Sequence, residues 1–215
     1  MFAHVLPENR VSVLPNGGDY PLANPEDKRS DSIEVLYLGN FIPSKGIMEF
    51  LQAAREIVKI NNRLHFTTAG SWQDDDTRKQ MLQDNVGYEA RVEIIDTVGE
   101  ERKWELLNRS HIFVFPTYYK YEGHPWVIIE AMAAGLPVVT TDHAAIPESV
   151  IDGHNGIIVE KRSPNAIKEA VLYLYEHAAQ RVQMGRNSRT LYEQRFTEKK
   201  FIDGLDKIFQ IVLNS

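Results

Sequence analysis

Residues 122–139 read EGHPWVIIEAMAAGLPVV, and this stretch decides the fold. Its central part, residues 126–134, is apolar on every side except at Glu130, which predicts a helix buried in the protein. Gly135 is suited to stop that helix, and Pro137 is suited to begin a strand. A buried helix that leads directly into an apolar strand indicates an α/β protein.

The same alternation of apolar β-branched runs and helix-period segments continues along the chain. Strands are predicted at residues 11–14, 33–38, 64–69, 92–95, 112–115, 137–140 and 156–159. Helices are predicted at residues 45–60, 77–83, 101–108, 125–134, 164–177, 179–195 and 199–213. The strands are too apolar to be half-exposed, so we expect a doubly wound, Rossmann-like parallel sheet with helices on both faces and extra C-terminal helices.

The composition excludes several classes of protein. The chain has 215 residues, of which 43% are hydrophobic, enough for one sizeable core. Its net charge of −6 argues against a nucleic-acid partner, and the absence of cysteine excludes disulfides and thiolate chemistry. The first residues do not resemble a signal peptide, and the longest apolar run, 126–134, is too short to cross a bilayer. We therefore expect a soluble, cytoplasmic protein.

In a doubly wound sheet, ligands bind beyond the carboxyl ends of the strands. Segments rich in glycine, proline and polar residues follow five of the predicted strands. They are residues 39–46, 70–72, 96–99, 116–126 and 141–145. Because these loops share one edge of the sheet, the sequence predicts a single site there.

Lys45 and Gly46 stand where one of these loops enters a helix. Ser44 is a reasonable N-cap, which would place both residues in the first helical turn. A cation and a glycine are poor choices for a helix start, unless an anion such as a diphosphate binds there. The alternative is a solvated lysine beside a turn glycine.

Glu130 and Glu122 are the carboxylates of interest. Glu130 lies in the buried helix and needs a partner, which is either a ribose diol or an internal arginine or backbone donor. Glu122 lies at the mouth of that helix, where it accepts from sugar hydroxyls or is simply a solvated loop acid. Pro125 suits the first position of the helix, and Gly123 lets the backbone approach a ligand closely.

Asp74, Asp75 and Asp76 have a spacing that can hold magnesium or manganese. They are better explained as acids that favour the start of the following helix. The histidines show no metal-ligand spacing. We therefore expect neither a metal nor a cofactor.

Residues 122–139 also resemble the donor-site motif of retaining GT-B glycosyltransferases of family 4. In that family, two glutamates separated by seven residues are followed by a run similar to EAMA-G-PVV. Further matches are Gly39 with Lys45-Gly46, Phe115-Pro116, Ile146-Pro147-Glu148, Asp152-Gly153 and Asn155-Gly156. The resemblance covers about residues 10–201 and implies a linker segment with the first strand at 1–32 and a donor-binding domain at 33–215. It also implies that the N-terminal acceptor domain is absent from this chain.

The resemblance implies a role for each matched residue. Lys45, Gly39 and Asn40 would bind the donor diphosphate. Glu122 would be catalytic and would bind the donor sugar together with Gly123, His124, Pro125 and Trp126. Glu130 would bind the ribose, and the loop at Val98 would face the base. Three positions depart from the family pattern. Asn40 stands in place of a phosphate-binding arginine, Pro125 lacks an amide that could face the ligand, and Ala144-Ala145 replaces a glycine pair.

The function implied is that of a hexosyltransferase donor domain. It would bind a nucleotide-diphosphate sugar for retaining transfer to a glycan or lipid-linked acceptor, and we expect this chain alone to be inactive. The full enzyme would act in the cytoplasm, with peripheral association at the inner face of the membrane. Two alternatives remain: a nucleotide-sugar epimerase of GT-B-like fold, and a non-catalytic nucleotide-sugar-binding subunit. Asn40 favours the second, whereas both glutamates and Lys45 argue against it.

Overall fold

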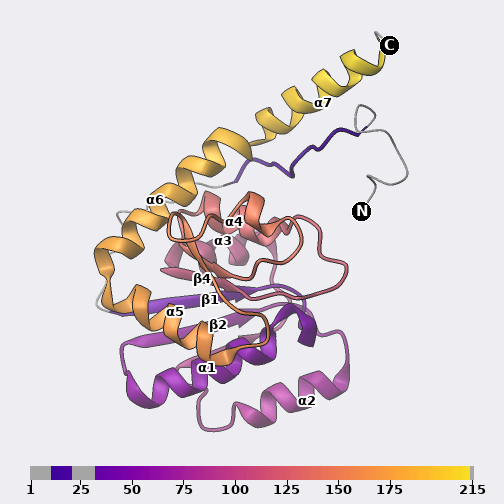
Figure 1. Cartoon of the computed structure of the whole chain (residues 1–215). Helices are drawn as coiled ribbons and strands as arrows, with labels where there is room; N and C mark the ends of the chain where they lie inside the picture. The colour runs from indigo at the N-terminus through magenta and orange to yellow at the C-terminus, as the bar shows by residue number, and fades with distance from the viewer. Residues whose placement is uncertain (1–10, 21–31, 214–215) are drawn as a thin grey trace.

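The computed structural model describes residues 11–20 and 32–213, which contain one parallel sheet (Figure 1). Its strands are β1 (Ile33–Leu38), β2 (Leu64–Ala69), β3 (Val92–Ile95), β4 (Ile112–Phe115), β5 (Val138–Thr140) and β6 (Gly156–Ile158). The strand order is β3-β2-β1-β4-β5-β6, and every neighbouring pair is parallel. The predicted doubly wound sheet is confirmed, with its switch point between β1 and β4.

The helices lie on both sides of the sheet (Figure 1). They are α1 (Ile47–Ile60), α2 (Asp75–Asp84), α3 (Glu100–Arg109), α4 (Trp126–Ala133), α5 (Pro164–Glu176), α6 (Ala178–Arg195) and α7 (Glu198–Leu213), with short 3₁₀ turns η3 (Pro43–Lys45) and η4 (Ile146–Glu148). α1 packs against α5, and α6 packs against α4. α7 extends away from the sheet, and no helix in residues 11–20 and 32–213 is long and apolar enough to span a membrane.

Apolar periodicity explains how the two central helices pack. In α1, Ile47, Phe50, Leu51 and Ile57 are fully buried, and their helical spacing puts them on the face toward the sheet. In α4, residues 128–133 are all buried, as predicted from a sequence that is apolar on every side except at Glu130. The buried helix α4 therefore starts at the carboxyl edge of the sheet, beside the switch point.

The strand predicted at residues 11–14 is wrong. Residues 11–20 form neither strand nor helix; Val11 and Val13 are exposed, and the Leu14 side chain lies against Gly204 of α7. β-branched residues favour a strand only where a neighbouring sheet edge can pair with the backbone, and this segment runs beside a helix instead (Figure 1). The rest of the expected linker, residues 1–10 and 21–31, lies outside the described residues.

Candidate functional site

The loop after β1 meets the loop after β2 through close backbone contact. A Cβ atom on Gly70 would lie 1.9 Å from the carbonyl oxygen of Gly39, so this approach requires glycine. Ser71 Oγ donates to Asn40 Oδ1 over 2.8 Å, and Phe41 forms a parallel β-bridge with Trp72. The two predicted site loops are therefore joined on one side of the switch point.

Lys45 and Gly46 come before the helix, which corrects the prediction that both lie in its first turn. Lys45 ends the 3₁₀ turn η3, and Gly46 is the N-cap of α1. Gly46 has a left-handed φ of 77°, and a Cβ atom there would lie 2.4 Å from the carbonyl oxygen of Pro116. The glycine is thus required by backbone conformation and by packing against the loop after β4.

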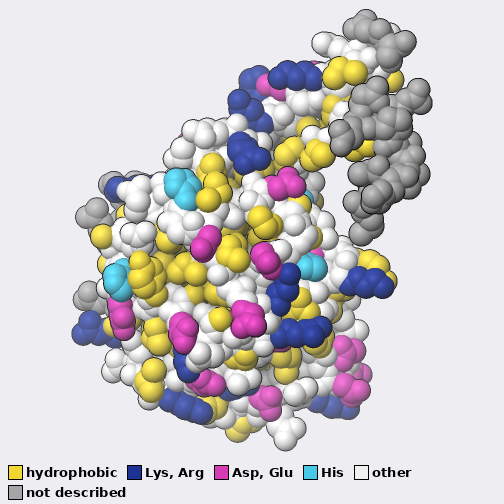
Figure 2. All heavy atoms as spheres, in the orientation of Figure 1, with side chains coloured by type: hydrophobic (Ala, Val, Ile, Leu, Met, Phe, Trp, Pro, Cys, Tyr) yellow, Lys and Arg dark blue, Asp and Glu magenta, His cyan; other side chains and the backbone are white. Residues whose placement is uncertain are grey.

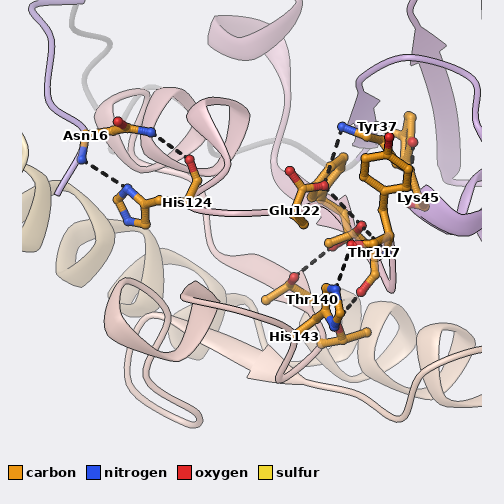
Figure 3. Close-up of polar contacts among 11 residues, drawn as sticks. Asn16, Tyr37, Lys45, Thr117, Glu122, His124, Thr140 and His143 are labelled. Carbon is orange, nitrogen blue, oxygen red and sulfur yellow. Dashed lines mark hydrogen bonds and ion pairs between the residues drawn. The ribbon is translucent and has the colours of Figure 1, made fainter. Parts of the chain in front are cut away.

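Lys45 and Glu122 pair with each other. Lys45 Nζ lies 3.4 Å from Glu122 Oε2, and their side chains are only 17% and 10% exposed. Thr117 Oγ1 donates to the same carboxylate oxygen over 3.2 Å, and Lys45 Nζ lies 5.3 Å from the ring centroid of Tyr119 (Figure 3). Neither residue is the solvated surface group that the alternative interpretation of the sequence allowed.

A cavity of about 250 Å³ opens beside this pair. It is lined by Gly39, Asn40, Lys45, Phe115, Glu122, His124, Pro125, Trp126 and Val127. The lining comes from the segment after β1 and from the end of β4, the loop after it and the start of α4, on either side of the switch point. It includes every residue predicted for the site except Gly123, Glu130 and Val98. Pro125 is the N-cap of α4 rather than its first helical residue, because its backbone is extended, with a ψ of 120°.

The loop after β5 holds the loop after β4 in place. His143 Nε2 donates to the carbonyl oxygen of Tyr119 over 2.7 Å, and Ala145 N donates to the carbonyl oxygen of Gly123 over 3.3 Å (Figure 3). Ala144 has a φ of 52°, a left-handed conformation that costs a residue with a Cβ about 1–2 kcal/mol. Alanine at this position is therefore strained where the family's glycine would not be.

Glu130 has an internal partner, and it is a lysine, not the arginine or backbone donor that the alternative interpretation of the sequence named. The residue is 7% exposed, and its Oε1 accepts from Lys103 Nζ over 2.7 Å. Lys103 Nζ also contacts Glu100 Oε1 at 2.9 Å. Burial raises the pKa of Glu130, and the hydrogen bond from Lys103 opposes that shift.

Val98 is half-buried against the core and does not line the cavity. It follows β3, and the next residue, Gly99, is the N-cap of α3. Glu100, the first residue of α3, shares Lys103 with Glu130. The Val98 loop thus leads into the charged cluster around Glu130 rather than into the cavity beside Lys45.

Two contributors were not identified from the sequence. Lys103 lies three residues after Glu100, a spacing typical of an exposed helical ion pair. The only signal in the sequence that could have identified Lys103 was the need of buried Glu130 for a positively charged partner. Thr117 lay within a loop assigned to the site but was not singled out. Its Oγ1 supports Glu122, and its carbonyl oxygen accepts from Thr141 Oγ1.

The three consecutive aspartates begin a helix, as expected. Asp74 is the N-cap of α2, and its Oδ1 accepts from the backbone N of Thr77 over 2.7 Å. This hydrogen bond lowers the pKa of Asp74. Among residues 11–20 and 32–213, no group of three or more histidine, aspartate or glutamate side chains is placed to hold a metal ion.

No basic surface dominates the molecule in the view of Figure 2. Among the described residues on that face, Lys and Arg side chains are interspersed with Asp and Glu. This agrees with the net charge of −6. An anion at the cavity would therefore depend on a few placed donors rather than on a broad positive field.

The strand order and the cavity at the switch point define a Rossmann-like α/β domain of the kind that binds ligands beyond its strand ends. Residues 22–191 match the family model described as "Glycosyl transferases group 1", and the chain belongs to this family.

Individual relatives agree with the family and the fold. The capsular polysaccharide biosynthesis glycosyltransferase CapM of Staphylococcus aureus is 28% identical over 184 residues, covering 86% of this chain and 47% of the relative. The structure of the C-terminal domain of the group 1 glycosyl transferase LpcC from Francisella tularensis has a TM-score of 0.70 and 24% identity, covering 83% of this chain and 96% of that one. The structure of Anabaena Alr3699/HepE with UDP and glucose has a TM-score of 0.73 and 18% identity, covering 86% and 49%. The chain spans about half the length of the curated relatives it matches.

Proposed function

We propose that this chain binds a nucleotide-diphosphate sugar and forms the donor half of a retaining hexosyltransferase of family 4. The observation that carries the proposal is the meeting of Lys45 and Glu122 at one wall of the cavity beside the switch point. A cation for a diphosphate and a carboxylate for sugar hydroxyls then stand a few ångströms apart. The Anabaena structure contains UDP and glucose, the two parts of such a ligand, and this supports the proposal.

Each residue has a definite task in this proposal. Lys45 turns from Glu122 to the diphosphate and stabilises the negative charge that develops as the sugar leaves. Glu122, held by Thr117, accepts hydrogen bonds from the donor sugar and fixes its orientation. Gly39 and Asn40 border the diphosphate, and Trp126, which is 48% exposed, forms a wall beside the sugar.

Glu130 and Val98 belong to the nucleoside end of the ligand in this proposal. Glu130 Oε1 is engaged by Lys103, and the ribose diol donates to the same carboxylate. Two donors on one carboxylate are compatible, because an ionised carboxylate has about four acceptor positions. The loop at Val98 leads into this cluster and lies toward the base.

The acceptor, a glycan or a lipid-linked saccharide, binds to a second domain in this proposal. No metal takes part, because the chain's own lysine supplies the positive charge. The chain alone therefore binds a nucleotide but does not transfer a sugar. Turnover by the pure chain would contradict the need for a second domain.

Calorimetric titration of the chain tests the proposal. The ligands are UDP, GDP and ADP, their sugar nucleotides, and the free nucleosides. One base series should bind clearly, with the diphosphate much tighter than the nucleoside. If no nucleoside diphosphate binds, the proposed function is wrong.

A further inference from the structure

A short N-terminal segment lies directly against the site loop. We call residues 16–20 the strap. Asn16 N donates to His124 Nδ1 over 3.3 Å, and Asn16 Nδ2 donates to the carbonyl oxygen of His124 over 2.8 Å (Figure 3). The two residues are 108 positions apart in the sequence. The strap therefore holds both the ring and the backbone of a residue that lines the cavity.

The strap is itself fixed to the helices at the C-terminal end. Gly18 N donates to the carbonyl oxygen of Phe196 over 3.0 Å, and Tyr192 Oη donates to the carbonyl oxygen of Gly18 over 2.8 Å. A Cβ atom on Gly17 would lie 2.8 Å from the carbonyl oxygen of Thr197. Asn16 is thus presented to His124 from a firmly packed backbone.

These contacts determine the tautomer of His124. A backbone N–H can only donate, so Nδ1 must be the unprotonated nitrogen that accepts from Asn16. Nε2 then carries the proton and donates to the hydroxyl of buried Ser149, which lies just after η4. The ring links three segments: the strap, the loop after β4 and the chain that follows β5.

The surroundings of the ring oppose its protonation. Burial lowers the pKa of His124, and Arg195 adds to this effect while Glu148 opposes it. The Phe196 ring packs 5.5 Å from the imidazole between centroids. A proton on Nδ1 would set two donors against each other at Asn16 N, so the hydrogen bond to the ring exists only with the neutral ring.

We propose that Asn16 is a positioning residue for the donor-sugar loop, which it holds through the neutral Nε2–H form of His124. The inference rests on the proposed function, because the loop from Glu122 to Trp126 is taken to bind the donor sugar. The strap is then part of the donor site, and loss of its hydrogen bonds weakens the sugar contacts more than the diphosphate contacts.

Three variants test this role. Asn16→Ala removes the side-chain donor, and His124→Phe keeps a ring without nitrogens. His124→Asn places an amide oxygen near the position of Nδ1 and keeps a neutral acceptor for Asn16 N. Calorimetry at pH 7.5 uses UDP-glucose, GDP-mannose and ADP-glucose with the matching diphosphates. We expect Asn16→Ala and His124→Phe to weaken the bound sugar nucleotide about tenfold, the loss of about one hydrogen bond, and its diphosphate less than twofold. His124→Asn should weaken the sugar nucleotide clearly less than His124→Phe does.

The pH profile separates positioning from simple packing. As the pH falls from 7.5 through the lowered pKa of His124, the wild-type affinity for the sugar nucleotide should fall, and His124→Asn should remove this fall. His177→Asn, which changes an exposed histidine at the start of α6, is the matched control and should retain the wild-type profile. Wild-type affinity in Asn16→Ala, or the same acid loss in His124→Asn, overturns the inference.

Nitrogen NMR of the wild-type imidazoles tests the tautomer without any variant. The His124 signals should report a protonated Nε2 and an unprotonated Nδ1 at neutral pH. The opposite tautomer overturns the inference even if every variant unfolds. A wild-type protein that binds no nucleotide contradicts the proposed function instead, so the two failures are distinguishable.

Discussion

The Lys45–Glu122 pair and the Lys103–Glu130 pair have nearly equal burial but different surroundings. Their side chains are 17% and 10% exposed in the first pair, and 18% and 10% exposed in the second. The first pair lies in loops beside a cavity, with its atoms 3.4 Å apart. The second joins α3 to α4 at 2.7 Å, and neither partner lines the cavity.

The charge around each pair also differs. Lys45 faces one carboxylate and the rings of Phe115 and Tyr119, so it can exchange that carboxylate for a phosphate. Lys103 already contacts two carboxylates, those of Glu100 and Glu130. That cluster carries a net negative charge and suits hydroxyl donors rather than phosphate. Although the two pairs are equally buried, the charges around them differ. An anion can replace Glu122 beside Lys45, whereas the Lys103–Glu130 pair links α3 to α4.

The largest effect should come from breaking the helical pair. Lys103→Met leaves the carboxylate of Glu130 buried without its cation, so we expect a loss of about 3 kcal/mol in unfolding free energy near neutral pH. The double variant with Glu130→Gln should recover most of the loss, because no unpaired charge remains. Urea unfolding of both variants measures this.

The loss in Lys103→Met should depend on pH. Burial raises the pKa of Glu130 above its unfolded value, and without Lys103 that rise is larger. A carboxyl group with a raised folded pKa favours the folded state below its unfolded pKa, and this advantage is lost as pH rises through the folded pKa. The deficit should shrink at pH 5 and grow toward pH 7.5. A deficit independent of pH would show that lost packing, and not the charge, is responsible.

Breaking the loop pair should affect binding rather than folding. Lys45→Ala should weaken a nucleoside diphosphate by about 1.5–3 kcal/mol, the range for a charge-assisted hydrogen bond, and leave the free nucleoside nearly unaffected. Calorimetry with both ligands measures the difference. Lys120→Ala is the matched control, because Lys120 also lies over an aromatic ring in the loop after β4 but does not line the cavity. Equal losses for both ligands would indicate a folding defect.

The fold could be predicted because its signals are local. Each apolar run is long enough to mark a strand or helix without knowledge of its neighbours, and parallel topology then brings the loops to one edge. The prediction failed at residues 11–14, where the apolar residues have no sheet edge to pair with. It also misplaced the start of α1, since the left-handed Gly46 is imposed by contact with Pro116, a residue distant in sequence.

The members of the site could be predicted better than their partners. Sequence spacing placed Lys45 and Glu122 in loops on the same edge, but their direct contact depends on how two side chains extend across a shared cavity. Lys103 lies 27 residues before Glu130, in a first helical turn made of charged residues, which suggests an exposed position. Such pairs depend on long-range packing, which a pattern of residue types does not encode.

The glutamates should have separate effects on two ligands. Glu130→Gln should weaken the nucleoside diphosphate and its sugar nucleotide alike, by about 1 kcal/mol, because the ribose is common to both. Glu122→Gln should weaken only the sugar nucleotide, by a similar amount. Calorimetry of both variants with both ligands distinguishes these patterns. A Glu122→Gln protein that binds the sugar nucleotide as the wild type does would exclude its role at the sugar.

The smallest effect concerns a carboxylate that has no lysine partner. Asp74 caps α2 through two hydrogen bonds from Thr77, so Asp74→Ala should lower the melting temperature by about 2–4 °C, the shift for one cap in a domain of this size. The lowered pKa of Asp74 means that this contribution is present above its unfolded pKa and disappears as pH falls through the folded pKa. Nucleotide affinity should be unchanged in the variant and insensitive to EDTA in the wild type. If EDTA abolishes binding and magnesium or manganese restores it, a metal must be part of the site, and Asp74→Ala then shows whether this aspartate holds it.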